Sequence, residues 1–114
     1  MKELFEIFEE LGLPYFRQGT LSDDNFPSSF FTFDNFDTPN ISFYDNDEKR
    51  YIEKINIYFY TNDPNLIYSK MNESIDEAKK KGFIVEGRGK DAPSGKENYY
   101  GRYLTINIIV RESY

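Results

Sequence analysis

Apolar residues recur with a helical period at the start of the chain. The positions that fall on one side of a helix are Leu4, Phe5, Ile7, Phe8 and Leu11. Glutamates occupy most of the other positions, so the segment has one apolar and one acidic side. This pattern predicts an amphipathic helix over residues 2–11 that ends at Gly12, with its apolar side in the core. Leu13 and Pro14 then direct the chain into an extended path.

The middle of the chain has the period of two that is typical of β-strands. It predicts strands over residues 30–36, 41–44 and 51–60. Phe31 and Phe33 share one face of the first strand. In the third strand, the residues predicted to face the core are Ile55, Ile57 and Phe59. Gly, Pro, Asn, Asp and Ser are frequent between the strands, which predicts an exposed loop over residues 19–29 and turns over residues 37–40 and 45–48.

A second amphipathic helix is predicted after Asp63 and Pro64, which suit an N-cap followed by proline at the first helical position. Three lysines and Gly82 mark its end. The residues on its apolar side are Ile67, Met71, Ile75 and Ala78. The remainder predicts a strand over residues 83–87, a loop over residues 88–98 and a long alternating strand over residues 99–111.

These elements predict an α+β fold. Their order is helix, three strands, helix and two strands (α-β-β-β-α-β-β). We expect a mainly antiparallel sheet of about five strands with two helices packed on one face. In the last strand one face carries Leu104, Ile106, Ile108 and Val110, and the other is amphipathic enough to meet a partner. A length of 114 residues fits one domain, residues 1–114.

Composition and charge exclude several classes of function. The chain has no Cys and no His, which removes thiolate nucleophiles, the usual catalytic triads and Cys- or His-ligated metals. A net charge of -6 opposes specific nucleic-acid binding. No run approaches the roughly 20 apolar residues that a membrane helix needs, and the acidic start is unlike a signal peptide. We expect a non-enzymatic protein without cofactor or metal, made in the cytoplasm, that binds no membrane.

Two short segments suggest ligand binding, and each has a simpler interpretation. Residues 45–48 are Asp-Asn-Asp-Glu, but an EF-type calcium loop needs Gly and Glu where this chain has Arg50 and Asn56, so a hairpin turn is preferred. Residues 87–90 are Gly-Arg-Gly-Lys, but they lack the context and the Lys-Ser/Thr ending of a phosphate loop, so a flexible loop is preferred.

Carboxylate pairs and tyrosines allow two further alternatives. Adjacent acids such as Asp23 and Asp24 do not define the cleft of a glycosidase, and a solubilising surface explains them. Five tyrosines could form a stacking platform for single-stranded nucleic acid: Tyr58, Tyr60, Tyr99, Tyr100 and Tyr103. The negative net charge favours core packing plus a protein interface for them instead.

Four segments, in their order and spacing, resemble a family of small prophage proteins from Gram-positive bacteria. They are LPYFRQG (13–19), PSSFFTFDN (27–35), FYDN (43–46) and YFYTNDP (58–64). The family is similar to the tail completion, or tail terminator, proteins at the head-to-tail junction of long-tailed phages, and the resemblance covers residues 13–114. It implies a structural protein that forms a ring, typically a hexamer, which caps the tail tube and docks to the head connector of the virion. The alternatives are another neck or tail component, or a stand-alone protein-binding module.

On this hypothesis three sets of residues are candidates for contacts. Turn chemistry and charge make exposed loops the candidates for partner contacts: Asp23, Asp24, Phe26, Arg88, Lys90 and Lys96. One face of the last strand is the candidate subunit interface: Tyr103, Thr105, Asn107, Ile109 and Arg111. Asp45 and Asp47 are candidates for the lumen of the ring, because an acidic wall does not retain DNA that passes through it. The expected partners are the tail tube protein and a head-connector or neck protein.

Overall fold

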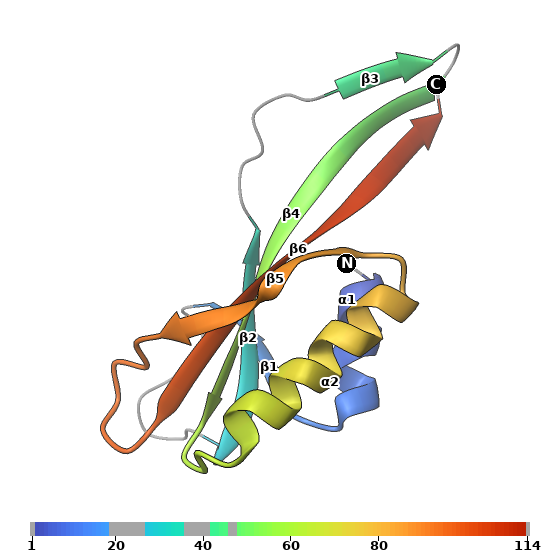
Figure 1. The fold of residues 1–114 in the computed structure, drawn as a ribbon. Helices are drawn as coiled ribbons and strands as arrows, with labels where there is room; N and C mark the ends of the chain where they lie inside the picture. The colour runs from blue at the N-terminus through green and yellow to red at the C-terminus, as the bar shows by residue number, and fades with distance from the viewer. Residues whose placement is uncertain (1, 19–26, 36–41, 46–47, 114) are drawn as a thin grey trace.

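The computed structural model describes residues 2–18, 27–35, 42–45 and 48–113 (Figure 1). Its elements are α1 (Lys2–Leu11), β1 (Tyr15–Arg17), β2 (Ser29–Asn35), β3 (Ser42–Asp45), β4 (Glu48–Thr61), α2 (Leu66–Lys80), β5 (Ile84–Ala92) and β6 (Tyr100–Ser113). The predicted α+β class is confirmed. The element order differs by one additional strand, β1, in the segment that the sequence marked only as extended.

The described strands form a mainly antiparallel sheet of six strands. Its order is β1-β2-β4-β6-β5, and β3 pairs with β4 outside this path. Only β1 and β2 are parallel, with Tyr15 opposite Phe31. The sequence predicted about five strands because β1 contains only three residues, too few to display a period of two.

Both helices pack on the same face of the sheet, and the core lies between the helices and this face (Figure 1). From α1, Phe8 is fully buried, with its ring 4.9 Å from that of Phe31 and 5.1 Å from that of Tyr15. Most of the predicted inward residues of the second helix and of the strands are buried: Ile67, Met71, Ile75, Ala78, Phe31, Phe33, Ile55, Ile57, Phe59, Leu104 and Ile106. On the same face of β6, Ile108 is only partly buried, and the side chain of Val110 lies outside the described structure. Burial of these side chains provides the main driving force for the fold.

The prediction for α2 was wrong at the start of the helix and correct at its end. The helix begins at Leu66 after the cap residue Asn65, so the predicted start at Asp63 and Pro64 was two residues too early. The Asp63 side chain accepts a hydrogen bond from the Asn65 amide (3.0 Å), which forms a turn before the helix. At the other end, Gly82 has a φ of +90° and follows the last lysines, as predicted.

Strand β5 is longer than the sequence predicted. It continues to Ala92, so the predicted loop over residues 88–98 was wrong for its first five positions. The pairing with β6 shifts between Glu86 and Lys90, where Gly87 and Gly89 have φ values of +72° and +96°. Glycines that suggest a loop here form a β-bulge inside a strand.

Strands β4 and β6 extend beyond the rest of the sheet. They stay paired from Thr61 opposite Tyr100 to Glu48 opposite Ser113, whereas β2 leaves β4 at Ile55. Beyond that point β3 is the other described strand beside them, and we call this three-stranded part the arm (Figure 1). The arm makes the molecule elongated, with extents of 52 × 26 × 22 Å. Neither described helix combines the length and the apolar character needed to cross a bilayer.

Candidate functional site

The sheet face opposite the two helices carries the candidate site. Strand pairing places three rows of residues across it: Phe30, Tyr60 and Gly101; Thr32, Tyr58 and Tyr103; and Asp34, Asn56 and Thr105. Asn107 follows Thr105 on the same face of β6. We call this surface the open face, because neither of the helices that the structure describes packs on it (Figure 1).

Aromatic rings form a continuous chain across the open face. Ring centroids are 6.1 Å apart between Phe16 and Phe30, and 5.5 Å apart between Phe30 and Tyr60. The rings of Tyr58 and Tyr60 are parallel within 1° at 6.2 Å. Tyr103 continues the chain at 5.9 Å from Tyr58. The chain crosses β1, β2, β4 and β6, so each ring is held by its neighbours and the surface is preorganised.

Polar side chains beside these rings are hydrogen-bonded across strands. The Tyr58 hydroxyl donates to Asp34 Oδ2 at 3.3 Å. The Thr105 hydroxyl donates to Asn56 Oδ1 at 2.8 Å. These bonds connect β2 to β4 and β4 to β6, and they fix the side chains in one arrangement.

The margin of the open face next to β5 carries exposed charges. Glu86 Oε2 accepts a hydrogen bond from Asn107 Nδ2 at 2.8 Å and lies 3.5 Å from Lys54 Nζ.

Two buried acceptors of the open face, Asp34 Oδ1 and Asn107 Oδ1, have no hydrogen-bond partner among the described residues. A buried acceptor without a donor is costly, so a donor from outside the described residues would stabilise this face.

Burial changes the ionisation of two tyrosines on the open face. It raises the pKa of Tyr60 above its ordinary value of 10.0. It also raises the pKa of Tyr58, and the negative charge of Asp34 adds to this effect. Both phenols therefore stay protonated at neutral pH, and the Tyr58 hydroxyl keeps the proton that it donates to Asp34.

The free energy of unfolding is expected to fall above pH 10, because the fold holds the protons of Tyr58 and Tyr60 more tightly than the unfolded chain does. Their contribution is complete below the ordinary pKa and is lost as the pH rises through the raised pKa values. Urea unfolding at about pH 9 and about pH 11 measures this loss. The Tyr60→Phe variant should lose less stability over that interval; an equal loss would contradict the assignment to Tyr60.

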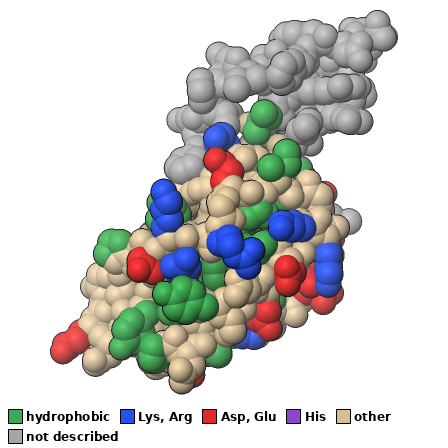
Figure 2. Space-filling view, in the orientation of Figure 1, with side chains coloured by type: hydrophobic (Ala, Val, Ile, Leu, Met, Phe, Trp, Pro, Cys, Tyr) green, Lys and Arg blue, Asp and Glu red, His purple; other side chains and the backbone are tan. Residues whose placement is uncertain are grey.

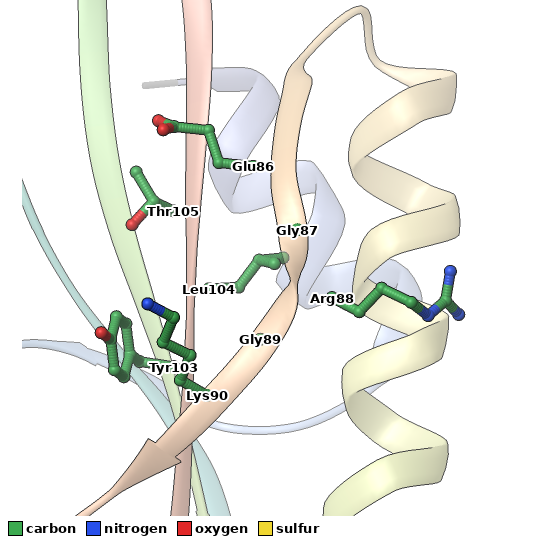
Figure 3. Close-up of a pocket in the computed structure, with 8 residues that line it drawn as sticks. All are labelled: Glu86, Gly87, Arg88, Gly89, Lys90, Tyr103, Leu104 and Thr105. Atoms are coloured by element: carbon green, nitrogen blue, oxygen red, sulfur yellow. The ribbon is translucent and has the colours of Figure 1, made fainter.

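A shallow pocket of about 170 Å³ lies where the open face meets β5. Figure 3 shows Lys90 beside Tyr103, and Glu86 near Thr105, whereas Arg88 points towards α2. Arg88 Nη2 donates to Asn72 Oδ1 of α2 at 3.1 Å. Pockets for small ligands usually have about 300–1,000 Å³, so this hollow is better suited to a protruding side chain of a partner.

The residues predicted for the subunit interface are partly brought together. Tyr103, Thr105 and Asn107 lie on the open face with the contacts given above. Ile109 and Arg111 belong to β6 in the arm, and their side chains lie outside the described structure. For these two residues the assignment stays a prediction.

The residues predicted for partner-contact loops do not form one group. Lys90 lies on β5 beside the open face, and Arg88 lies on β5 but faces α2, so both were wrongly placed in a loop. Lys96 lies in the turn after β5, where its amide donates to Ser94 Oγ at 3.2 Å. The others, Asp23, Asp24 and Phe26, lie outside the described residues.

The two candidates for the lumen are Asp45 and Asp47. Asp45 ends β3 in the arm, without a described side chain, and Asp47 lies outside the described residues. In the part of the chain that is described, no three residues among His, Cys, Asp and Glu are grouped as a metal site requires.

Sequence reasoning missed the open-face residues on β2 and β4. Thr32, Asp34 and Asn56 contribute to the site, but none of them was a candidate. The alternation along the two strands could have identified them, because they alternate with the buried residues Phe31, Phe33, Ile55 and Ile57. No model of a known protein family matches the chain, and no curated protein matches it.

Proposed function

We propose that this chain is a structural, non-enzymatic subunit of a ring at the head-to-tail junction of a long-tailed phage. The ring, a hexamer by the resemblance, caps the tail tube and docks to the head connector. The observation that carries the proposal is the open face, a preorganised aromatic surface of rings that lie against one another across four strands. The resemblance of residues 13–114 to tail completion proteins supplies the biological setting.

The composition of the open face suits a contact between proteins. Tyrosine is enriched in interfaces because its ring is apolar and its hydroxyl is polar, and three tyrosines adjoin on this face. The exposed Lys54–Glu86 pair lies at its margin, where interfaces are usually polar. In a closed ring, the open face of each subunit meets a different surface of the next one.

The arm supplies a second contact. A short ribbon without a helix behind it is marginally stable in water, and its edges offer unpaired backbone groups. In the proposed ring, a neighbouring subunit or the tail tube protein covers the arm. Asp45 and Asp47 then belong to the lumen, and the segment that contains Asp23, Asp24 and Phe26 contacts partners together with Lys96.

The test is the mass of the purified protein by light scattering, alone and with the major tail tube protein from the same genome. We expect a ring-sized species, or tubes capped at a fixed length. Thr105→Arg places a long side chain in the middle of the open face and should abolish both, because its bulk occupies the space that the neighbouring subunit needs for close packing. The matched control Ser69→Arg makes the same change on the exposed side of α2 and should retain both.

Two outcomes would contradict the proposal. If the unmodified protein stays monomeric and leaves the tubes uncapped, the chain is another neck component or a stand-alone binding module. If Thr105→Arg folds, by circular dichroism, and still assembles, the open face is not the subunit interface.

A further inference from the structure

A groove of about 420 Å³ lies at the end of the sheet where α2 begins. It is formed by the start of α2, the end of β5 and the start of β6. The residues that give it its character are Pro64, Tyr68, Asp91, Pro93, Tyr99 and Tyr100. Figure 2 shows hydrophobic side chains gathered on this part of the surface, with charged side chains around them. Gly101 lines the groove and also lies on the open face, so the two surfaces adjoin at this end of the sheet, whereas Tyr68 and Asp91 belong to the groove alone.

Two exposed tyrosines border the groove. Tyr68 is 61% exposed and Tyr100 is 49% exposed. Ile84 is the other large apolar residue that is exposed in the described part of the chain, so most of this exposure is concentrated in one place. Neither tyrosine hydroxyl is hydrogen-bonded to a described residue. The groove thus offers apolar ring faces together with two free O–H donors, a combination that marks a binding surface.

The groove is preformed, because a buried arginine holds one of its sides. Arg102 is mostly buried; its Nη1 donates to Asp91 Oδ1 and its Nη2 donates to the Gly89 carbonyl, both at 2.9 Å. Its guanidinium lies 4.9 Å from the centre of the Tyr68 ring, in a cation–π contact. The Tyr99 hydroxyl donates to the Pro27 carbonyl at 2.9 Å. A groove that is already ordered loses little entropy when it binds.

Among the described residues that line the groove, the charged one is Asp91. The Asp91 side chain is 83% exposed, whereas that of Arg102 is only 15% exposed. One Asp91 oxygen is taken by Arg102, and the other faces solvent. A cationic group of a partner is therefore favoured at this end.

We propose that this groove binds an extended, proline-containing segment of another protein that carries a basic residue. Proline-rich segments adopt a polyproline II helix, which has no internal hydrogen bonds and offers its carbonyls to donors. The proline rings of such a segment fit between aromatic side chains, and the Tyr68 and Tyr100 hydroxyls are placed to donate to the carbonyls of the segment. The basic residue meets Asp91. This inference does not depend on ring formation, so either can fail without the other.

The experiment is a titration of the ¹⁵N-labelled protein with a synthetic peptide that has two prolines three positions apart and a terminal arginine. We expect saturable amide shifts around Tyr68 and Tyr100. Tyr68→Ala should weaken binding by about tenfold, and Tyr68→Phe, which keeps the ring and its contact with Arg102, by less. Asp91→Asn should weaken binding of this peptide but not of one with alanine in place of arginine. The control Lys79→Ala, on an exposed part of α2, should bind as the unmodified protein does.

Three results would overturn the inference. The first is the absence of saturable binding by the unmodified protein. The second is equal binding of a peptide in which alanines replace the prolines. The third is a set of amide shifts confined to the open face, around Tyr58 and Tyr103.

Discussion

Replacing Phe8 by alanine is expected to lower the free energy of unfolding by about 3–5 kcal/mol. Phe8 is fully buried, and its ring contacts those of Tyr15, Phe31 and Phe33. The substitution leaves a cavity between α1 and the sheet and removes a side chain that holds β1 against β2. Urea unfolding followed by circular dichroism measures the loss.

Phe5→Ala is the matched control for this prediction. Phe5 lies on the same helix and also contacts Tyr15 and Phe33, but it is only partly buried. Its replacement should therefore cost less than that of Phe8. Equal losses for the two variants would mean that α1 does not pack on the sheet as described.

Gly101→Ala is expected to destabilise the protein by an amount at the upper end of about 1–3 kcal/mol. A Cβ at this position would lie 2.6 Å from the Ala92 carbonyl oxygen of β5, and 2.8 and 2.9 Å from two ring atoms of Tyr60. The oxygen belongs to a paired strand and cannot move freely. The Tyr60 ring must then leave its place against the glycine, which disturbs its contacts with Phe30 and Tyr58.

Two measurements check the Gly101 prediction. Urea unfolding gives the stability, and spectrophotometric titration of tyrosinate should show earlier ionisation of Tyr60 once its ring is displaced. Gly95→Ala is the control, since its Cβ would meet no atom within 4 Å and the φ of +67° is the sole penalty. That penalty is about 1–2 kcal/mol, without an effect on Tyr60. A Gly101→Ala variant that costs no more than this would refute the close packing.

Elements that rest on local periodicity were predictable from the sequence. The inward residues of α1, α2, β4 and β6 follow from spacing alone, because a buried face repeats with the period of its element. Strand β1 did not follow, because its three residues are too few to show a period of two. The start of α2 was placed too early because Asp63 caps a turn whose hydrogen bonds resemble those of a helix start.

The candidate site was predictable in part, for the same reason. Alternation alone placed Tyr103, Thr105 and Asn107 on one face. Their cross-strand neighbours depend on the strand register, which a single sequence does not encode locally. Arg88 shows how a bulge interrupts alternation. Glu86 lies opposite Thr105 and Lys90 opposite Tyr103, so three residues of β5 lie between these two pairs, where a regular strand has one. The alternation is therefore interrupted, and Arg88 faces α2 while Glu86 and Lys90 do not.

The strand order also constrains how the chain can fold as it is synthesised. Strand β6 leaves the ribosome after β5, yet it lies between β4 and β5 in the sheet. Until β6 emerges, β5 has no strand beside it, and β4 presents a long unpaired edge. Helix α1 and strands β1, β2 and β4 can associate early, but the sheet closes only in a late step that joins distant segments, which is intrinsically slow. A nascent chain of this kind needs protection from wrong pairing at β4 until that step is complete.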